Sequence, residues 1–163
     1  MEIGFVRIDD RLIHGQVVTI WLKESGCNRI MACSDEVAKD DLRKQLLIQV
    51  ATPGIKAYVI PIEKAIEAYK DPKYDSFKTL FLFTNPTDVV RMIEGGVDIK
   101  SVNVGGMCYK QGKKQITGAV SVNEADIEAF KKLNEKNIEL EIRQVAKDSK
   151  INLMDKLKDL RLI

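Results

Sequence analysis

The sequence contains a single histidine, His14, within the segment RIDDRLIHGQV. The run Glu2–Ile8 predicts a strand before it, and Gly15–Glu24 predicts a helix after it. Neutral imidazole is a good nucleophile near pH 7, and the free N–H groups at the start of a helix bind anions. Arg11, three residues upstream, adds a planar guanidinium suited to phosphate. These residue types at this spacing predict a histidine that receives a phosphoryl group and passes it on.

Other residues of the same segment could support this chemistry. Gly15 permits close backbone approach at the helix start, so a phosphoryl group would receive N–H bonds there while Arg11 closed on its oxygens. Asp9 or Asp10 could hold the imidazole tautomer or fix Arg11, and either could equally be the acidic end of a solvated turn. Arg7, near the end of the predicted strand, is also expected to support the site.

Short apolar runs that alternate with amphipathic segments must position this site. Such runs are typical of parallel strands covered by helices on both faces; they are Ile3–Ile8, Arg29–Cys33, Lys56–Ile60, Thr79–Phe83 and Ser101–Val104. The segments between them predict helices, with apolar side chains at Ile62, Ala65, Ile66 and Tyr69, at Leu42, Leu46 and Val50, and at Val89, Val90 and Ile93. We expect the sheet to use all these apolar faces, leaving no spare stripe for a dimer, and Trp21 to pack in the core.

The pattern changes after Gly105. The stretch GGMCYKQGKKQIT predicts a loop or hairpin around Gly112, and Asn123 is expected to cap a helix. The alternation of Ile138, Leu140 and Ile142 with charged residues predicts a strand with one wet face, at an edge of the sheet. Ser149 is expected to cap a final helix.

The predicted fold is therefore α/β, with residues 1–163 forming a single domain. A single open, mostly parallel sheet is covered by helices on both faces, with a C-terminal hairpin and an antiparallel edge strand. Ligands of such sheets bind beyond the carboxyl ends of the strands, which is where His14 falls.

Further residues that follow predicted strands share this edge. Gly105 and Gly106 either line the site, where bare backbone near an anion is useful, or form a tight turn. Asp35 and Asn85 are expected to cap helices, although they could also line the site. Three lysines form a basic cluster that is either a solvated loop or a contact for an acidic partner: Lys110, Lys113 and Lys114.

Composition excludes several classes of function. The formal net charge is only +2, which gives no reason to expect nucleic acid as a partner. Three cysteines without a CxxC pair and one histidine argue against a metal site, and no cofactor is expected. The sequence has no signal-peptide pattern, no apolar stretch long enough to span a membrane, and no Rossmann or P-loop motif. We expect reduced thiols and a cytoplasmic location.

The long motif RIDDRLIHGQV resembles the active-site segment of the enzyme IIB components of the mannose/fructose/sorbose class of bacterial sugar phosphotransferase systems. The resemblance covers nearly the whole chain. It extends through the segments SDEVAKDDLRKQLL, TNPTDVVRMIEGGVDIKSVNVGGM, KKQIT and ELEIRQV.

The resemblance implies specific roles. His14 matches the histidine that is phosphorylated through Nδ1, Arg11 a phosphate-binding arginine, and Gly15 the glycine that starts the following helix. It implies a IIA protein as phosphoryl donor, on a separate polypeptide since no IIA domain is fused here. It also implies a sugar acceptor carried by IIC and IID membrane components, which the protein would meet transiently at the inner face of the membrane. The alternative is a regulatory or binding module that keeps the fold without serving transport.

Overall fold

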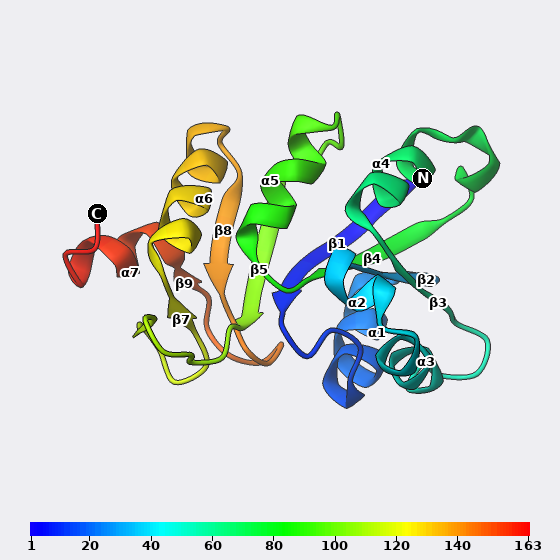
Figure 1. The fold of residues 1–163 in the computed structure, drawn as a ribbon, viewed down its shortest axis with the longest axis horizontal. Helices are drawn as coiled ribbons and strands as arrows, with labels where there is room; N and C mark the ends of the chain where they lie inside the picture. The colour runs from blue at the N-terminus through cyan, green and yellow to red at the C-terminus, as the bar shows by residue number, and fades with distance from the viewer.

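The computed structural model describes residues 1–163 and contains one seven-stranded sheet with the strand order β3-β2-β4-β1-β5-β8-β9 (Figure 1). The first six strands in this order are parallel, and β9 is antiparallel to β8 at the edge. The strands are β1 (Glu2–Asp9), β2 (Arg29–Cys33), β3 (Lys56–Ile60), β4 (Lys78–Phe83), β5 (Ser101–Gly106), β8 (Glu139–Ile142) and β9 (Ile151–Asn152). The predicted α/β class with an antiparallel edge strand is confirmed.

Helices cover both faces of the sheet, as predicted. They are α2 (Asp35–Lys39), α3 (Asp41–Gln49), α4 (Ile62–Lys70), α5 (Pro86–Glu94), α6 (Glu124–Glu135), α7 (Leu153–Asp159), a short 3₁₀ turn η2 (Pro72–Tyr74), and a helical stretch after β1 made of π-helix η1 (Val17–Trp21) and α1 (Leu22–Ser25). No helix is both long and apolar enough to cross a bilayer.

Alternate residues of each strand contribute to two separate cores. In β4, Phe81 and Phe83 pack into the larger core with α4, α5, α6 and α7, whereas Leu80 and Leu82 pack into the smaller core with η1 and α1. This alternation follows from the two-residue period of a strand. The smaller core includes Trp21, which is buried as expected.

Helix caps explain where several helices start. Asn85 and Asn123 cap α5 and α6 through their side chains, as predicted. Ser34, rather than Asp35, caps α2. Asp35 instead accepts a hydrogen bond from the N–H of Ile62 at the start of α4 and pairs with Arg91, and these contacts lower its pKa.

Three details near the C-terminus differ from the sequence predictions. Strand β8 is parallel and lies one strand in from the edge, because the two-residue β9, too short to show a periodic pattern, pairs with its outer side. The hairpin joins β6 (Lys114–Gln115) to β7 (Ser121–Val122), so its turn surrounds Gly118, whereas Gly112 lies in an earlier turn. Asn152, not Ser149, caps α7 because the extended β9 separates Ser149 from the helix.

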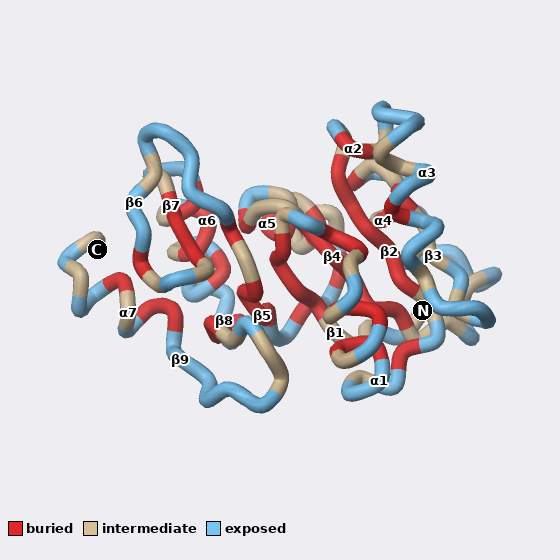
Figure 2. Tube along the Cα trace, turned by 90° about the horizontal axis from the view of Figure 1, so that it is seen from below, coloured by how far each residue is buried: buried red, intermediate tan, exposed pale blue.

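The apolar stripe of α3 faces solvent, contrary to the prediction. Leu42 is 69% exposed, Leu46 55% and Val50 44%, while only Leu47 of this helix is buried. Figure 2 shows α3 as one of the most exposed helices of the molecule. The four-residue spacing gave the correct helix but the wrong orientation, because a single leucine on the other side attaches it to the smaller core. The expectation that no apolar stripe is left over is therefore wrong.

Candidate functional site

The segment between β1 and the first helix forms a tight turn at the carboxyl edge of the sheet. The N–H of Leu12 donates to the carbonyl of Asp9, and the N–H of Asp10 donates to the carbonyl of Gly106 in β5. Leu12 has a φ of 57°, a conformation that is unfavourable for leucine, and its side chain is completely buried in the smaller core. Core packing therefore holds the turn in a shape that local preference alone would not select.

Asp9 and His14 form the central contact of the site. The Nε2 atom of His14 lies 2.8 Å from Oδ2 of Asp9. An ionised carboxylate only accepts hydrogen bonds, so Nε2 must carry the proton. In the neutral imidazole, Nδ1 then keeps its lone pair and is the nucleophilic nitrogen.

The surroundings keep Asp9 ionised. Burial alone would raise the pKa of this carboxyl, but hydrogen bonds from His14 and Arg11 and the charge of Arg7 outweigh it, so the pKa lies well below its ordinary value. Arg11 donates from its backbone N–H and from Nε to Oδ1, at 3.1 Å and 3.3 Å, and from Nη2 to Oδ2 at 3.3 Å. Asp9 therefore both holds the imidazole tautomer and fixes Arg11, the two roles that the sequence left open.

Arg7 lies beneath the site and is fully buried. Its Nη2 donates to Asp9 at 3.1 Å and to the carbonyl of Gln144 at 3.0 Å, and its Nη1 donates to Oδ1 of Asn103 at 2.6 Å and to the carbonyl of Arg143 at 3.2 Å. These acceptors satisfy both Nη atoms, whereas the buried Nε has no hydrogen-bond partner. Burial lowers the pKa of Arg7, and the charge and hydrogen bond of Asp9 oppose this shift. Arg7 thus supports Asp9 from below and forms no hydrogen bond with His14.

Of the two glycines of β5, Gly105 makes room for this network, whereas a Cβ on Gly106 would meet only ordinary van der Waals contact. A Cβ atom on Gly105 would lie 1.9 to 2.3 Å from the guanidinium atoms of Arg7, and one on Gly106 would lie 3.4 Å from Asp9. The predicted alternative of a tight turn is wrong for this pair, because both residues belong to the strand. The role of Gly105 is to let the buried guanidinium of Arg7 approach the backbone.

An aromatic side chain contacts the buried guanidinium groups. Trp21 stacks on Phe5 with ring centroids 4.9 Å apart, and the guanidinium carbons of Arg7 and Arg143 each lie 5.0 Å from its ring centroid. Such cation–π contacts are strongest where water is excluded. The tryptophan therefore links the first helix to the charged network.

The helix that follows His14 presents unpaired donors. Its first backbone bond runs from Val18 to the carbonyl of His14, and the N–H groups of Gly15, Gln16 and Val17 have no acceptor within the chain. Gly15 is exposed, and no atom lies within 4 Å of the position its Cβ would occupy. These amides are available to an anion at the nucleophilic histidine.

Other predicted residues lie near the site without joining its central contacts. The carboxylate of Asp10 accepts from the N–H of Cys108 at 2.6 Å, and so ties the turn to the segment after β5. The three lysines of the predicted basic cluster differ in their contacts. Lys110 makes no ion pair, Lys113 pairs with Asp126 at 3.3 Å, and Lys114 is the first residue of β6.

Sequence reasoning missed four residues that contribute to the site. Asn103 was detectable, since it is a polar residue within the apolar run SVNV and is 2% exposed. The backbone carbonyls of Arg143 and Gln144 had no signal, because any residue supplies a carbonyl. Arg43, on α3, donates to the carbonyl of Asp10 at 3.3 Å. It had no signal in the sequence, because only the tertiary fold brings it to the site. No group of three or more His, Cys, Asp or Glu side chains is arranged to hold a metal ion.

Comparison with known proteins decides the family. Residues 3–162 match the family model described as the PTS system sorbose subfamily IIB component. The chain belongs to this family. This IIB chain is 46% identical to the sorbose-specific EIIB component of Klebsiella pneumoniae, over 98% of this chain and 97% of that relative. The crystal structure of the IIBSor domain of the Klebsiella pneumoniae sorbose permease superposes with a TM-score of 0.95, at 46% identity and 98% coverage of both chains.

Other relatives of this IIB chain differ in length and in the sugar that they are named for. The mannose-specific EIIAB component of Escherichia coli K12 is 59% identical over 155 residues, which is 95% of this chain but 48% of that relative. The chain thus spans about half the length of these relatives. The N-acetylgalactosamine-specific IIB component 1 of Escherichia coli has a TM-score of 0.83 at 34% identity, covering 91% of this chain and 97% of that chain.

Proposed function

We propose that residues 1–163 act as one phosphocarrier unit of a sugar phosphotransferase system. His14 accepts a phosphoryl group from a phosphorylated IIA protein and passes it to a sugar during uptake through IIC and IID membrane components. The observation that carries this proposal is the 2.8 Å contact between Nε2 of His14 and Asp9, which leaves Nδ1 free to react. The work would take place in the cytoplasm, transiently at the inner face of the membrane.

The reaction consists of two in-line transfers. In the first, the Nδ1 lone pair of His14 attacks the phosphorus of the donor phosphohistidine; the new N–P bond forms as the donor N–P bond breaks, and the donor leaves as imidazole. In the second, a sugar hydroxyl oxygen attacks that phosphorus, the bond to Nδ1 breaks, and the hydroxyl proton passes to solvent. Positioning and charge stabilisation carry most of the catalysis in such transfers.

Two groups in the site suit the phosphoryl oxygens. The unpaired N–H groups from Gly15 to Val17 lie directly after His14 in the chain. Arg11 has a side chain that is 54% exposed, and its Nη1 makes no hydrogen bond within the chain. Charge-assisted hydrogen bonds of this kind stabilise by about 1.5–3 kcal/mol each when partly desolvated.

The partner proteins need an approach surface around His14. Two proteins that dock specifically bury roughly 800 Å² each, a patch about 16 Å in radius. Arg43 bonds to the turn that carries Arg11 and so holds α3 beside this turn, and Leu42 and Leu46 are exposed on the same helix. We assign them the apolar part of the docking surface.

The test is intact-mass analysis after incubation with phosphoenolpyruvate, the general phosphotransferase proteins and a cognate IIA. We expect one acid-labile, base-stable phosphoryl adduct on the wild-type protein and none on His14→Ala, since the chain has no other histidine. An unmodified wild-type protein beside a demonstrably phosphorylated IIA would refute the phosphocarrier proposal.

A further inference from the structure

An open pocket of about 610 Å³ lies beside Arg11. Its walls come from the turn after β1, the end of β5 with the segment that follows it, the β6–β7 hairpin, Gln144 and α3. Figure 1 shows the ends of β1 and β5 side by side at the carboxyl edge of the sheet, with the β6–β7 hairpin on one side and α3 on the other. The pocket is large enough for a small polar molecule, and the proposed transfer does not by itself account for it.

The pocket has more positive than negative charge. Arg11, Arg43 and Lys110 line it, and neither Arg43 nor Lys110 forms an ion pair. Asp10 is the only carboxylate in the lining, and it already accepts a hydrogen bond from Cys108. The unpaired cations favour an anionic ligand, and a phosphate group matches the guanidinium geometry.

The remaining lining suits a polyhydroxylated ligand. The side chains of Gln115, Ser121 and Gln144 line the pocket and make no hydrogen bond within the chain, so their donors and acceptors are available to hydroxyl groups. Tyr109 is 66% exposed and offers a flat apolar face. The bare backbone of Gly106 lets a ligand come close.

We propose that this pocket binds a sugar phosphate, the product class of the second transfer, with its phosphate group between Arg11, Arg43 and Lys110. The inference rests on the proposed function in one respect, since it takes the identity of that product from it. His14 does not line the pocket itself, so the pocket would hold the product beside Arg11, three residues before the histidine that has just released the phosphoryl group.

The experiment is a titration of the unphosphorylated ¹⁵N-labelled protein, followed by amide chemical shifts in NMR, with mannose 6-phosphate, mannose and inorganic phosphate as separate probes. Mannose 6-phosphate should cause saturable shifts between Gly105 and Lys110 with a Kd in the millimolar range, on the order of 1 mM. Each of the other two probes should bind at least about ten-fold more weakly, because each lacks one half of the ligand.

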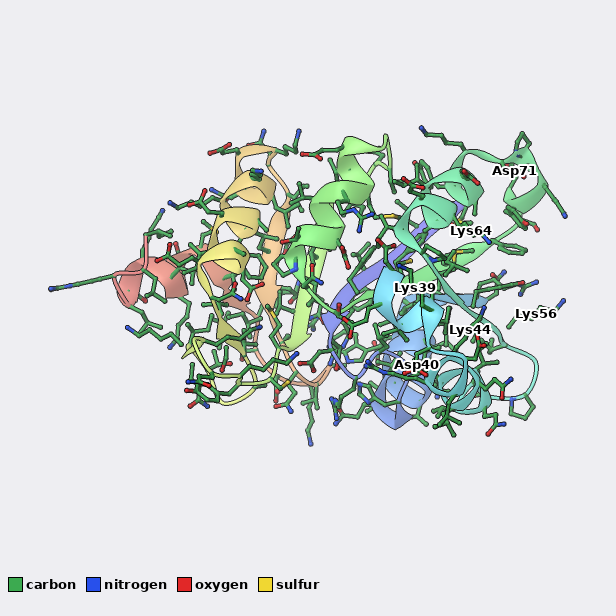
Figure 3. All side chains as sticks on the ribbon, viewed as in Figure 1. Lys39, Asp40, Lys44, Lys56, Lys64 and Asp71 are labelled. Carbon is green, nitrogen blue, oxygen red and sulfur yellow. The ribbon has the colours of Figure 1, made fainter.

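Variants locate the site. Arg43→Gln and Lys110→Gln should each weaken mannose 6-phosphate binding by about five-fold or more, and Lys110 makes no contact whose loss would disturb the fold. Lys44→Gln is the matched control: Lys44 lies on the same helix, is labelled in Figure 3, and does not line the pocket. It should bind like the wild-type protein.

Three outcomes would overturn the inference. These are the absence of saturable shifts, equal affinity for inorganic phosphate and mannose 6-phosphate, or equal weakening by Lys44→Gln. Because the titration needs no phosphoryl donor, its result is independent of the mass analysis. Binding without phosphorylation of His14 would remove the phosphocarrier proposal and leave the pocket, whereas phosphorylation without binding would do the reverse.

Discussion

Replacing Asp9 with asparagine tests the central contact of the site. The carboxylate bonds to His14, Arg11 and Arg7, and it is completely buried. Asparagine has nearly the same shape but no charge, and it presents an NH₂ group in place of one oxygen. The substitution therefore changes the electrostatics and the hydrogen-bond pattern with little change in volume.

The expected loss of stability follows from Arg7. Removing one partner of a buried ion pair costs roughly 3–5 kcal/mol, because the other charge remains buried. Arg7 keeps three neutral acceptors, on Asn103, Arg143 and Gln144. The loss should therefore fall near the lower end, about 3 kcal/mol. Urea unfolding followed by circular dichroism measures it, and a protein of ordinary stability would stay folded.

The rate of phosphoryl transfer should fall by more than the lower free energy of unfolding alone would cause. If the asparagine NH₂ faces His14, Nε2 must accept a hydrogen bond, so the proton moves to Nδ1 and removes its lone pair. A carboxylate-to-amide change that selects the wrong tautomer lowers rates by about 10²–10⁴-fold in comparable sites. Rapid-quench measurement of transfer from phosphorylated IIA gives the rate, and ¹⁵N shifts of the imidazole report the tautomer.

Asp10→Asn is the matched control for this experiment. Asp10 is the adjacent carboxylate, it bonds to Cys108, and it does not touch His14. Its variant should keep the wild-type imidazole tautomer and lose less than about ten-fold in rate. A folded Asp9→Asn protein with the wild-type tautomer and rate would refute the positioning role of Asp9.

The same residue predicts a dependence of stability on pH. The folded protein lowers the pKa of Asp9, so below about pH 4 the unfolded chain binds a proton that the folded chain does not. The stability that Asp9 contributes is therefore fully present above its unfolded pKa and is lost as the pH falls toward its folded pKa. Urea midpoints at pH 5, 4 and 3 should fall more steeply for the wild-type protein than for Asp9→Asn; parallel slopes would contradict this assignment.

Three further substitutions test separate parts of the site. Arg11→Lys keeps the charge but loses the planar fork, so transfer should slow about ten-fold with unchanged urea stability, and a wild-type rate would exclude a bidentate role. Gly105→Ala places a Cβ against Arg7 and should cost about 1–3 kcal/mol or more in urea unfolding, whereas Gly118→Ala, with nothing within 4 Å, should be nearly neutral. Leu46→Lys should raise the KM for phosphorylated IIA about five-fold without affecting the fold. The control is Ile151→Lys: Ile151 is also apolar, is 43% exposed and lies on the distant edge strand, so this variant should keep the wild-type KM. Equal KM values for the two variants would remove α3 from the docking surface.

The sequence was sufficient to predict the parallel strands β1 to β5, because each is a short apolar run between helical patterns, but it misplaced β8 at the edge and missed β9. It also predicted that His14 and Arg11 lie at the carboxyl edge, since both follow the first strand directly. The orientation of α3 could not be predicted in the same way. Its leucines repeat with a helical period, but a period does not show whether the repeating face or the opposite face meets the sheet.

The support beneath the site could not be derived from spacing either. Arg7 is separated from Asn103 by 96 residues and from the carbonyl of Gln144 by 137. Parallel pairing of β1 with β5, and of β5 with β8, brings these groups together. The only local signs of this network were two polar residues within predicted apolar strands, Arg7 and Asn103, and neither could identify its partners.

His14, Arg11 and Arg7 all bond to Asp9. This matters for the proposed phosphocarrier, because a carrier must release its phosphoryl group as well as accept it. Arg7 has three other acceptors and is buried, so it stays in place; Arg11 has Asp9 as its only side-chain partner and is half exposed. Phosphoryl oxygens on Nδ1 would bind the free Nη1 of Arg11 without disturbing Asp9, but would compete with Asp9 for Nε and Nη2. Exchanging one anionic partner for another stabilises the phosphorylated state less than capture by a free arginine would, because the Asp9 contacts are lost in return. In the proposed phosphocarrier, this arrangement would position the phosphoryl group without holding it so tightly that the sugar hydroxyl could not remove it.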